Sequence, residues 1–354
     1  MKYELELNEN TVLLSINGTI GNVAFYNNEK IVLGKSASYI ICNTDLNAIF
    51  LFYVLQSNFI KKYFSTQLTG TTISNLSLSS IRHMLFHLPL LPEQEKIVSI
   101  LSNVDNLIES TGKVITHSKK VKTGLMQKLL TRGIGHTKFK KVPWLFGKEI
   151  EIPEEWEMKK FEKIAEFLGG FAFHSSDYIE NGIQLLRQGN LQNHKLDLDK
   201  DPKFLSNQHA LDFKKFIINS GDIVISLTGT LEKKDYGYAV LISSNQKKML
   251  LNQRMAKISP TQNIDPVFLT FLMNHPYFEL QFYRLEAGTK QANVSLQDVK
   301  KIDILAPSLQ EQQKIASILS NIDSKITTQE QYKEKLERLK KSLMQKLLTG
   351  EVRV

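Results

Sequence analysis

Features that would identify a secreted protein or a membrane protein are missing from these 354 residues. Cys42 is the only cysteine, which excludes a disulfide within the chain and a zinc site built from cysteines. The longest apolar run, AIFLFYVL at 48–55, is far shorter than the roughly 20 residues that span a bilayer. The N-terminal stretch MKYELELNEN has no apolar signal region. We therefore expect a soluble, cytoplasmic protein.

Motifs of DNA-modifying and nucleotide-hydrolysing enzymes are also absent. The chain has no N-P-P-Y or D-P-P-Y motif for adenine methylation, since NIDPVF at 263–268 lacks the second proline. It has no Walker loop, FLGGF at 167–171 is an incomplete cofactor loop, and EQEK at 93–96 lacks the acidic partner of a nuclease site. The histidines have no metal-ligand spacing. The sequence thus predicts a protein without catalytic residues or a metal site.

What the chain does contain is an ordinary globular composition with an excess of positive charge. Hydrophobic residues make up 42% and charged residues 23%, and the length suffices for about two domain cores. The formal net charge is +9. This charge is compatible with a polyanionic partner, because Lys and Arg gain affinity for phosphates by releasing condensed counterions.

The most informative feature is a long internal repeat. PLLPEQEKIVSILSNVD at 89–105 recurs as PSLQEQQKIASILSNID at 307–323, and LMQKLLT at 125–131 recurs at 343–349. Both recurrences have an offset of 218 residues. Solenoid and propeller repeats have periods of about 20 to 50 residues, so this repeat indicates duplication of a whole domain together with the element that follows it.

Each repeated phrase predicts a long helix with one apolar stripe. In the second copy, Ser308 and Glu311 have the spacing of a capping box, and Gly350 can end the helix in the left-handed conformation. Nearly forty residues would give a rod of roughly 60 Å. The predicted stripe consists of Ile315, Leu319, Ile322, Ile326, Tyr332, Leu336, Leu339, Leu343 and Leu347, and in the first copy of Ile97, Leu101, Val104, Ile108, Val114, Val121, Leu125 and Leu129.

Such helices need a companion for the stripe, and the other copy in the same chain is the simplest one. We therefore expect the two helices to pair antiparallel as a spacer within one chain. A coiled coil that only dimerises the protein is the alternative interpretation.

The segments ahead of the two helices predict short strands and turns. GDIVISLTGTLEKKDYGYAVLI at 221–242 corresponds to NTVLLSINGTIGNVAFY at 10–26, and the second copy carries seven extra residues there. The second unit extends back to about residue 151, whereas Met1 corresponds to about Asp212. We therefore expect the first unit to lack roughly sixty residues and to expose apolar strand edges.

A family resemblance follows from these residues. IPEEWE, the GDIVIS strand, a G-T loop before N-V-S or N-L-S, and a long helix that begins with the EQ-x-KI phrase and ends in LMQKLLTG together resemble the DNA specificity subunit of type I restriction-modification enzymes. The resemblance covers essentially the whole chain. It implies an α+β fold in which two target-recognition domains alternate with two conserved helices that pair antiparallel.

The resemblance also implies a function and partners. Each recognition domain would read one half of a split double-stranded DNA site, and because the first unit is shortened we expect only residues 151–305 to read DNA well. The helices would dock methyltransferase subunits, with restriction subunits completing the complex, and these partners would carry out the chemistry. S-adenosylmethionine, ATP and magnesium would be bound by those partner subunits, and no cofactor by this chain. The expected segments are a partial first recognition domain at 1–88, a helical spacer at 89–133, a linker at 134–150, a complete second recognition domain at 151–306 and a second spacer at 307–350.

Residues that could contact DNA lie in the loops of the second domain. Arg reads guanine, and Asn or Gln reads adenine, in the major groove, whereas lysines usually meet phosphates. The predicted contacts are Arg187, Gln188, Asn190, Thr228, Thr230, Lys233, Lys234, Tyr236, Arg254, Thr289, Lys290, Gln291 and Asn293. Polar turns remain the alternative for RQGN at 187–190 and GTKQAN at 288–293, and Arg254 could instead pair with a carboxylate.

Other functions also remain open. The chain could be the specificity polypeptide of a related type II system, a truncated variant that needs a complementing fragment, or a coiled-coil scaffold without a DNA role.

Overall fold

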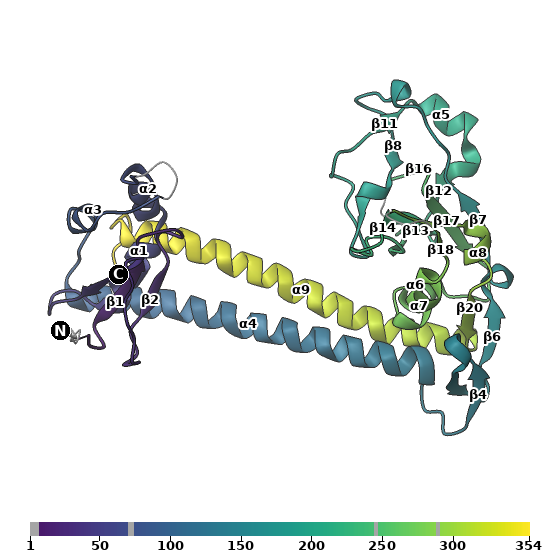
Figure 1. The fold of residues 1–354 in the computed structure, drawn as a ribbon, viewed down its shortest axis with the longest axis horizontal. Coiled ribbons are helices and arrows are strands. Elements are labelled where there is room, and N and C mark those ends of the chain that lie inside the picture. The colour runs from purple at the N-terminus through teal and green to yellow at the C-terminus, as the bar shows by residue number, and fades with distance from the viewer. Residues whose placement is uncertain (1–6, 70–73, 244–246, 288–290) are drawn as a thin grey trace. The chain divides into compact units, whose positions relative to one another are not determined.

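The computed structural model describes residues 7–69, 74–243, 247–287 and 291–354. The chain forms two compact units: unit 1 comprises residues 1–117 and 326–354, and unit 2 comprises residues 118–325. The long helices α4 (Leu91–Arg132) and α9 (Leu309–Leu348) contribute one part to each unit (Figure 1). Both predicted helices are thus confirmed, and they pair antiparallel.

The pairing of α4 with α9 repeats the same contacts in each unit. In unit 1, the Lys340 ammonium lies 2.6 Å from the Asp105 carboxylate and 5.5 Å from the ring centroid of Tyr53. Unit 2 has the same arrangement, with Lys122 at 2.6 Å from Asp323 and over the ring of Phe271. All three positions differ by the 218-residue offset. The duplication therefore preserves the register of the helix pair as well as the sequence.

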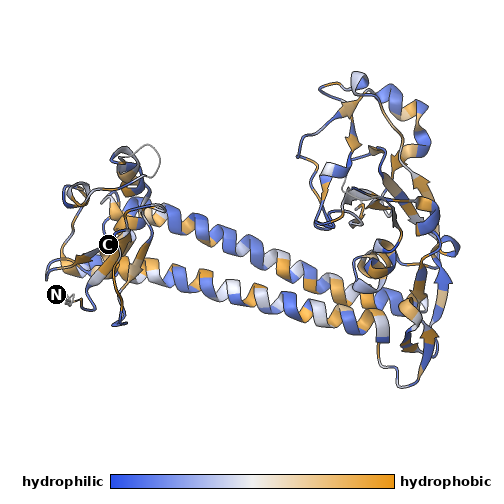
Figure 2. Cartoon of the chain, viewed as in Figure 1, coloured by the Kyte–Doolittle hydropathy of each residue, from blue (hydrophilic) through white to orange (hydrophobic). Residues whose placement is uncertain are grey.

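The predicted apolar stripe is correct at most positions and wrong at four. Leu101, Leu129, Leu319 and Leu347 near the ends and Ile326 and Leu336 in the middle of α9 are buried, and Figure 2 shows apolar and polar residues alternating along both helices. However, Val114, Val121, Tyr332 and Leu339 are 40–49% exposed, whereas Thr111, Ile115, Ala316, Met344 and Leu348 are buried. The buried positions Val104, Thr111 and Ile115 keep one heptad phase. The four exposed residues lie out of that phase, and the prediction included them because it followed apolar residue types alone.

Unit 1 contains a small antiparallel sheet covered by helices. Strands β1 (Thr11–Ser15), β2 (Val23–Phe25) and β3 (Ala37–Ile41) are arranged in the order β2-β1-β3. Helices α1 (Ala48–Gln56), α2 (Asn58–Thr66) and α3 (Leu78–Arg82) follow. The alternating burial of β1 turns Val12 and Leu14 inward, where they join Phe50 and Leu51 of α1 and Leu348 of α9 in one core.

Unit 2 is larger and contains several sheets. Its strands are β4 (Phe139–Pro143), β5 (Glu149–Pro153), β6 (Glu157–Lys160), β7 (Ala165–Gly169), β8 (Ile183–Leu186), β9 (Leu191–Gln192), β10 (Lys195–Leu196), β11 (Phe204–Leu205), β12 (Ile217–Ile218), β13 (Ile223–Ser226), β14 (Thr228–Thr230), β15 (Ala239–Leu241), β16 (Met249–Leu251), β17 (Met255–Pro260), β18 (Glu286–Ala287), β19 (Gln291–Val294) and β20 (Asp303–Ala306). Its shorter helices are α5 (Asn207–Asp212), α6 (Pro266–Met273), α7 (Pro276–Tyr283) and α8 (Leu296–Val299), with 3₁₀ turns η1 (Leu145–Gly147), η2 (Phe161–Lys163), η3 (Ser175–Asp177), η4 (Gln188–Asn190) and η5 (Lys214–Phe216).

Three of these sheets form the framework of unit 2. Their orders are β15-β13-β17-β7, β11-β8-β16-β12 and β14-β19-β18. The first of them corresponds to the sheet of unit 1, since Leu14 pairs with Ser38 in unit 1 as Ile225 pairs with Ala256 in unit 2. Strand β7 extends this sheet beyond β17. The described part of unit 1 has no counterpart of β7.

Residues 134–150, for which the sequence predicts a linker, include most of a β-hairpin. Strands β4 and β5 pair antiparallel from Phe139 with Pro153 to Pro143 with Glu149. Trp144 in the turn stacks on Tyr277 with ring centroids 4.3 Å apart. The hairpin thus packs against the core of unit 2, which includes Ile152 and is contacted by Val142, Trp144 and Ile150.

The repeated dipeptide Glu-Gln at the start of each long helix holds neighbouring segments together. The buried Gln94 accepts from the Asn47 N–H at 2.8 Å and donates to the carbonyl oxygens of Asp45 and Pro89. Gln312 makes the three equivalent bonds with Asp265, Asn263 and Pro307. In each unit, the side chain thereby fixes the start of α1 or α6 against the start of a long helix.

The glutamate binds the segment that follows the other long helix. Glu311 accepts from the Ile134 N–H at 2.9 Å and from Trp156 Nε1 at 3.0 Å, and its Oε1 lies 2.8 Å from His136 Nε2. The predicted capping box is therefore only half correct. Ser308 does accept from the Glu311 N–H at 3.3 Å, but the carboxylate is used by Ile134, His136 and Trp156 instead of reaching back to the helix start.

In unit 1, the equivalent Glu93 binds Arg353 through two bonds of 2.6 Å each. The Arg353 guanidinium holds the pKa of Glu93 below its ordinary value.

Candidate nucleic-acid interface

Strand β19 presents one polar face to the outside and one apolar face to the core. Gln291 and Asn293 are exposed, whereas Ala292 and Val294 are buried. The neighbouring strand β14 pairs with β19 so that Thr228 is opposite Asn293 and Thr230 is opposite Gln291. Directly opposed residues have their side chains on the same face of a sheet. Four polar side chains that the sequence predicts as DNA contacts are therefore brought together on one surface.

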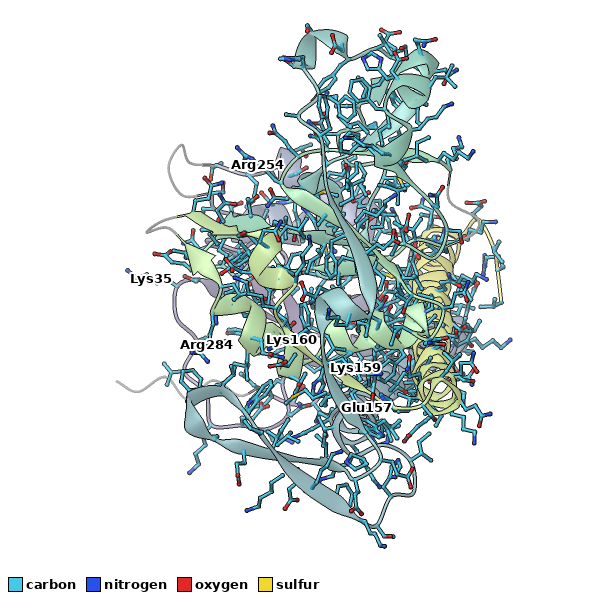
Figure 3. The ribbon with its side chains drawn as sticks, turned by 90° about the vertical axis from the view of Figure 1, so that its right-hand side faces the viewer. Lys35, Glu157, Lys159, Lys160, Arg254 and Arg284 are labelled. Carbon is cyan, nitrogen blue, oxygen red and sulfur yellow. The ribbon has the colours of Figure 1, made fainter. Side chains whose placement is uncertain are left out.

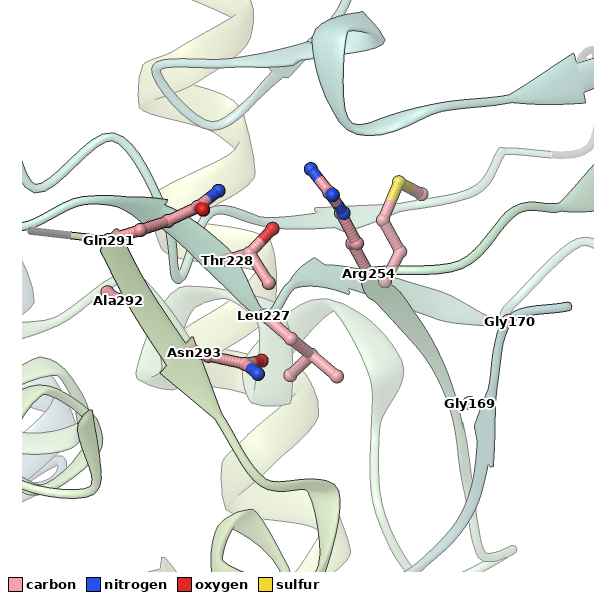
Figure 4. Close-up of a pocket in the computed structure, with 9 residues that line it drawn as sticks. Gly169, Gly170, Leu227, Thr228, Arg254, Gln291, Ala292 and Asn293 are labelled. Atoms are coloured by element: carbon pink, nitrogen blue, oxygen red, sulfur yellow. The ribbon is translucent and has the colours of Figure 1, made fainter. Parts of the chain in front are cut away.

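This surface forms one side of an open hollow of about 650 Å³. The hollow is also lined by Gly169, Gly170, Leu227, Arg254 and Met255, and Figure 4 shows Thr228 between Gln291 and Arg254. We refer to it as the β19 hollow. It brings together predicted residues from three separate parts of the sequence, because β14, β19 and the turn before β17 meet there.

Arg254 is the cation of the β19 hollow. It lies in the tight connection between β16 and β17 with a φ of 68°, a region that residues other than glycine rarely adopt. Its side chain is exposed, and Figure 3 shows it on a different part of unit 2 from Glu157, Lys159 and Lys160 of β6. Among the residues that the structure describes, no carboxylate partner of Arg254 is found. The guanidinium is therefore accessible to an anion or a base edge.

Gln188 forms the link between η4 and the β19 hollow. Its Oε1 accepts from the Thr228 hydroxyl at 2.7 Å, and its Nε2 donates to the Thr228 carbonyl oxygen. Because both ends of the amide are occupied, Gln188 positions Thr228 and has little capacity left for another acceptor or donor.

The other two predicted contacts of the RQGN stretch, Arg187 and Asn190, form hydrogen bonds within the protein. Asn190 is 1% exposed, accepts from the Arg187 N–H and donates to the carbonyl oxygens of Asp197 and Lys200. The Arg187 guanidinium donates to Asp201. Lys203 and Arg187 together hold the pKa of Asp201 below its ordinary value. In this part of the site, the polar-turn interpretation describes the geometry better than direct base contact does.

The turn after β14 separates two exposed lysines from a buried tyrosine. Lys233 and Lys234 are exposed, and the Lys234 ammonium lies 5.0 Å from the ring centroid of Tyr283. Tyr236 is fully buried against the rings of Phe282 and Tyr283. Tyr236 therefore belongs to the core, and we withdraw it together with Asn190 from the residues expected to touch DNA.

Two predicted residues, Thr289 and Lys290, lie outside the described residues. Conversely, the sequence analysis missed Gly169, Gly170, Leu227 and Met255 as lining residues. The glycine pair was the available signal, since glycine in a strand often marks a close backbone approach. A Cβ atom at Gly170 would collide with the backbone oxygen of Asn252.

The described residues contain no group of three or more His, Cys, Asp or Glu side chains placed to hold a metal ion. In the same part of the chain, no helix is both long and apolar enough to cross a membrane.

Comparisons with known proteins identify the family of the chain. The family described as type I restriction modification DNA specificity domain matches residues 2–117 and 153–338. The chain is 31% identical over 353 residues to the type I restriction enzyme MjaVIII specificity subunit of Methanocaldococcus jannaschii, with coverage of 99% of this chain and 81% of that protein. It is 30% identical over 348 residues to the putative MjaX specificity subunit of the same organism, with coverage of 95% and 76%.

The fold is also similar to a solved structure. The type I restriction-modification system S subunit from M. genitalium superposes with a TM-score of 0.59 at 16% identity, covering 98% of this chain and 84% of that one. These findings confirm the resemblance that the repeated phrases indicated. The chain belongs to the DNA specificity subunits of type I restriction-modification systems, which are non-catalytic.

Proposed function

We propose that unit 2 reads one half of a two-part DNA site through the β19 hollow. The observation that carries this proposal is the convergence of Arg254, Gln291 and Asn293, three exposed side chains of the types that recognise base edges, around one open surface. Arg254 suits guanine, and the two amides suit adenine. Thr228 and Gln188 hold the wall of the hollow, and Thr230 lies at its rim opposite Gln291.

Lys233 and Lys234 have a different role in this proposal. They are exposed on the turn that follows β14, next to the hollow in sequence, and their charges would meet phosphates and fix the position of the duplex without selecting a sequence. Arg187 holds the η4 loop through Asp201 and shapes the surface indirectly. Thr289 and Lys290 directly precede Gln291, and we retain them as proposed contacts on the basis of sequence alone.

The complete complex would include other subunits. Unit 1 would contact the second half of the site, and the paired helices α4 and α9 would dock methyltransferase subunits at equivalent positions, since their contacts repeat at an offset of 218 residues. Restriction subunits would join this assembly. S-adenosylmethionine, ATP and magnesium would be bound by those partners, which would perform methylation and cleavage.

The test is to compare variants of single residues by DNA binding and by mapping methylated adenines in cells that also make the cognate methyltransferase. Gln291→Ala and Arg254→Ala should change the preference at particular base pairs, with a loss of about 1 to 3 kcal/mol for the preferred base. Lys233→Ala should weaken binding to all sequences equally and flatten the salt dependence.

A matched control is Gln297→Ala, which removes an exposed glutamine of α8 outside the hollow and should leave the recognised sequence unchanged. The proposal is wrong if Gln291→Ala and Arg254→Ala leave base preference unchanged at every position while DNA binding remains sequence-specific.

A further inference from the structure

Unit 1 contains a second hollow that the reading function does not use. It has a volume of about 790 Å³ and lies beside the outer edge of β3. Apolar side chains from three segments line most of it, and we refer to it as the β3 hollow. Its lining includes Ala37–Ile40 of β3, Leu51 of α1, Ile81 of α3, and Met84 and Phe86 beyond α3.

Two backbone segments border the β3 hollow, and each has one side that pairs with no strand among the described residues. Strand β3 is the last strand in the order β2-β1-β3, and its pairing pattern with β1 turns the N–H and C=O groups of Tyr39 and Ile41 outward. Residues 85–88 belong to no helix or strand and pair with no described strand. Leu85 is 90% exposed and Leu88 is 50% exposed. Such edges are sites for the addition of another strand.

The duplication identifies what fills the equivalent place in unit 2. Residues 85–88 correspond to β20, which pairs antiparallel with β6. Strand β3 corresponds to the 255–259 part of β17, where β7 pairs with residues 256–259. The single segment Glu157–Gly169 thus provides the partner strands of both places in unit 2, because it contains β6 and β7.

The turn between β6 and β7 fills the interior. Phe161 is fully buried, its ring lies edge-on to Phe167 with centroids 4.8 Å apart, and its N–H donates to the Ile302 carbonyl oxygen at 2.9 Å. The Glu162 N–H donates to the carbonyl oxygen of Lys300. Ile302 and Lys300 are the equivalents of Met84 and Arg82, both of which line the β3 hollow.

We propose that the β3 hollow binds an extended peptide segment with the pattern of residues 157–169. One strand of the segment would pair with residues 85–88, the second with β3, and a phenylalanine between them would enter the hollow. This is strand addition, in which main-chain bonds give affinity and side-chain pockets give selectivity.

The cations of the β3 hollow support an occupant with an aromatic ring. The two charged residues that line the hollow, Lys35 and Arg82, are both cations, whereas the segment that fills the equivalent place in unit 2 carries three glutamates and three lysines. Lys300, the equivalent of Arg82, lies over the Phe167 ring at 5.9 Å from the centroid. Arg82 would therefore cover an aromatic ring of the occupant in the same way.

The experiment measures binding of a fluorescein-labelled peptide with the sequence of residues 154–171, EEWEMKKFEKIAEFLGGF, to the full chain by fluorescence anisotropy. We expect saturable binding of one peptide per chain. A Phe161→Ala peptide should bind at least about tenfold more weakly, because it no longer fills the apolar interior.

A pair of backbone-modified peptides tests strand addition directly. In unit 2, Leu168 faces Lys257 of β17, whereas the Phe167 N–H points away from that strand. N-methylation at Leu168 should therefore weaken binding about as much as Phe161→Ala, and N-methylation at Phe167 should have little effect. On the protein side, Tyr39→Pro should abolish binding because it blocks the outward edge of β3, and Tyr39→Thr is the matched control.

Absence of saturable binding, or equal effects of the two N-methylated peptides, would overturn the proposal. Binding that Tyr39→Pro leaves intact, while circular dichroism shows the variant to be folded, would also overturn it. DNA binding measured on the same protein samples separates this outcome from the reading function, since the β19 hollow lies in unit 2. Normal base preference without peptide binding would refute only the role of the β3 hollow.

Discussion

Units 1 and 2 share a framework but differ in how their sheets end. Both have an antiparallel core sheet, a helix capped by Asn47 or Asp265, and a glutamine that binds the same three backbone groups. In unit 2, β7 pairs with β17, and β6 pairs with β20. In the described part of unit 1, β3 and residues 85–88 have no equivalent partner strand. The shared framework depends on local contacts, whereas completion of the sheet depends on a separate segment.

This difference distinguishes two kinds of stabilisation. Contacts at the 218-residue offset, such as those of Gln94 and Gln312, hold each unit to its pair of helices. Contacts of Phe161 and β7 add core only to unit 2. We therefore expect equivalent substitutions in the framework to have similar effects in both units, and substitutions in the added segment to affect unit 2 alone.

The largest expected effect comes from charges in the helix pair. Leu101→Asp and Leu319→Asp each bury a carboxylate at a fully buried position, and an unpaired buried charge is strongly unfavourable. Each variant should unfold or aggregate, as measured by circular dichroism and size-exclusion chromatography. The control is Val114→Asp, which introduces the same charge at a position 49% exposed on the same helix as Leu101. If Leu319→Asp remains a folded monomer with full helix content, the helix pair does not have the role described here.

The next effect should be confined to unit 2. Phe161→Ala removes a fully buried ring, and such changes cost about 3 to 5 kcal/mol. Hydrogen exchange followed by mass spectrometry should show faster exchange in β7 and β17 with unchanged protection of β1 and β3. Phe146→Ala, at a position 74% exposed, serves as the control. Equal loss of protection in the two units would contradict the assignment of the segment to unit 2.

A smaller effect should distinguish the two glutamates that bind the helix ends. Glu311 interacts with Ile134, His136 and Trp156, whereas Glu93 binds one exposed arginine. Glu311→Gln should therefore lower the melting temperature more than Glu93→Gln does. A larger effect of Glu93→Gln would reverse this order and refute the comparison.

Acid should abolish the contribution of the Glu93–Arg353 pair. Arg353 lowers the pKa of Glu93, so the stabilisation is complete above the pKa of the unfolded chain and disappears as the pH falls through the lower folded-state value. The difference in melting temperature between wild type and Glu93→Gln should consequently shrink on acidification. A difference that stays constant with pH would show that the carboxylate charge is not involved.

The smallest effect is expected for the ion pairs between the helices. Asp323→Asn should cost no more than about 1 kcal/mol, because the pair is partly exposed. Asp105→Asn should cost slightly more, since Asp105 also accepts from the Tyr53 hydroxyl at 2.8 Å, whereas unit 2 has Phe271 at that position. Chemical denaturation measures both values. In a Tyr53→Phe protein, the costs of Asp105→Asn and Asp323→Asn should become more alike.

The sequence predicts the helices and the repeat well because both leave periodic patterns. Helix α9 spans Leu309–Leu348, within the bounds expected from Ser308 and Gly350. The four exposed positions of the stripe were missed, since following apolar residue types alone leaves the heptad phase that buries Thr111 and Ile115. The hairpin at 139–153 was missed because its alternation is short.

The β19 hollow was predictable only in part. Residue types indicated Arg254, Gln291 and Asn293, but the sequence does not show whether a polar side chain is occupied within the protein. Asn190 and Tyr236 have suitable chemistry and are nevertheless buried. Their partners lie in other segments, which only the folded chain brings together.

The bonds of Gln94 and Gln312 have a consequence for inheritance. Each glutamine binds only main-chain atoms of the unit that it holds, so this joint does not depend on the side chains of that unit. Two genes that share the repeated phrase can recombine within it and exchange everything upstream while preserving these bonds. Such a crossover would need no compensating mutations at the bonds of these two glutamines.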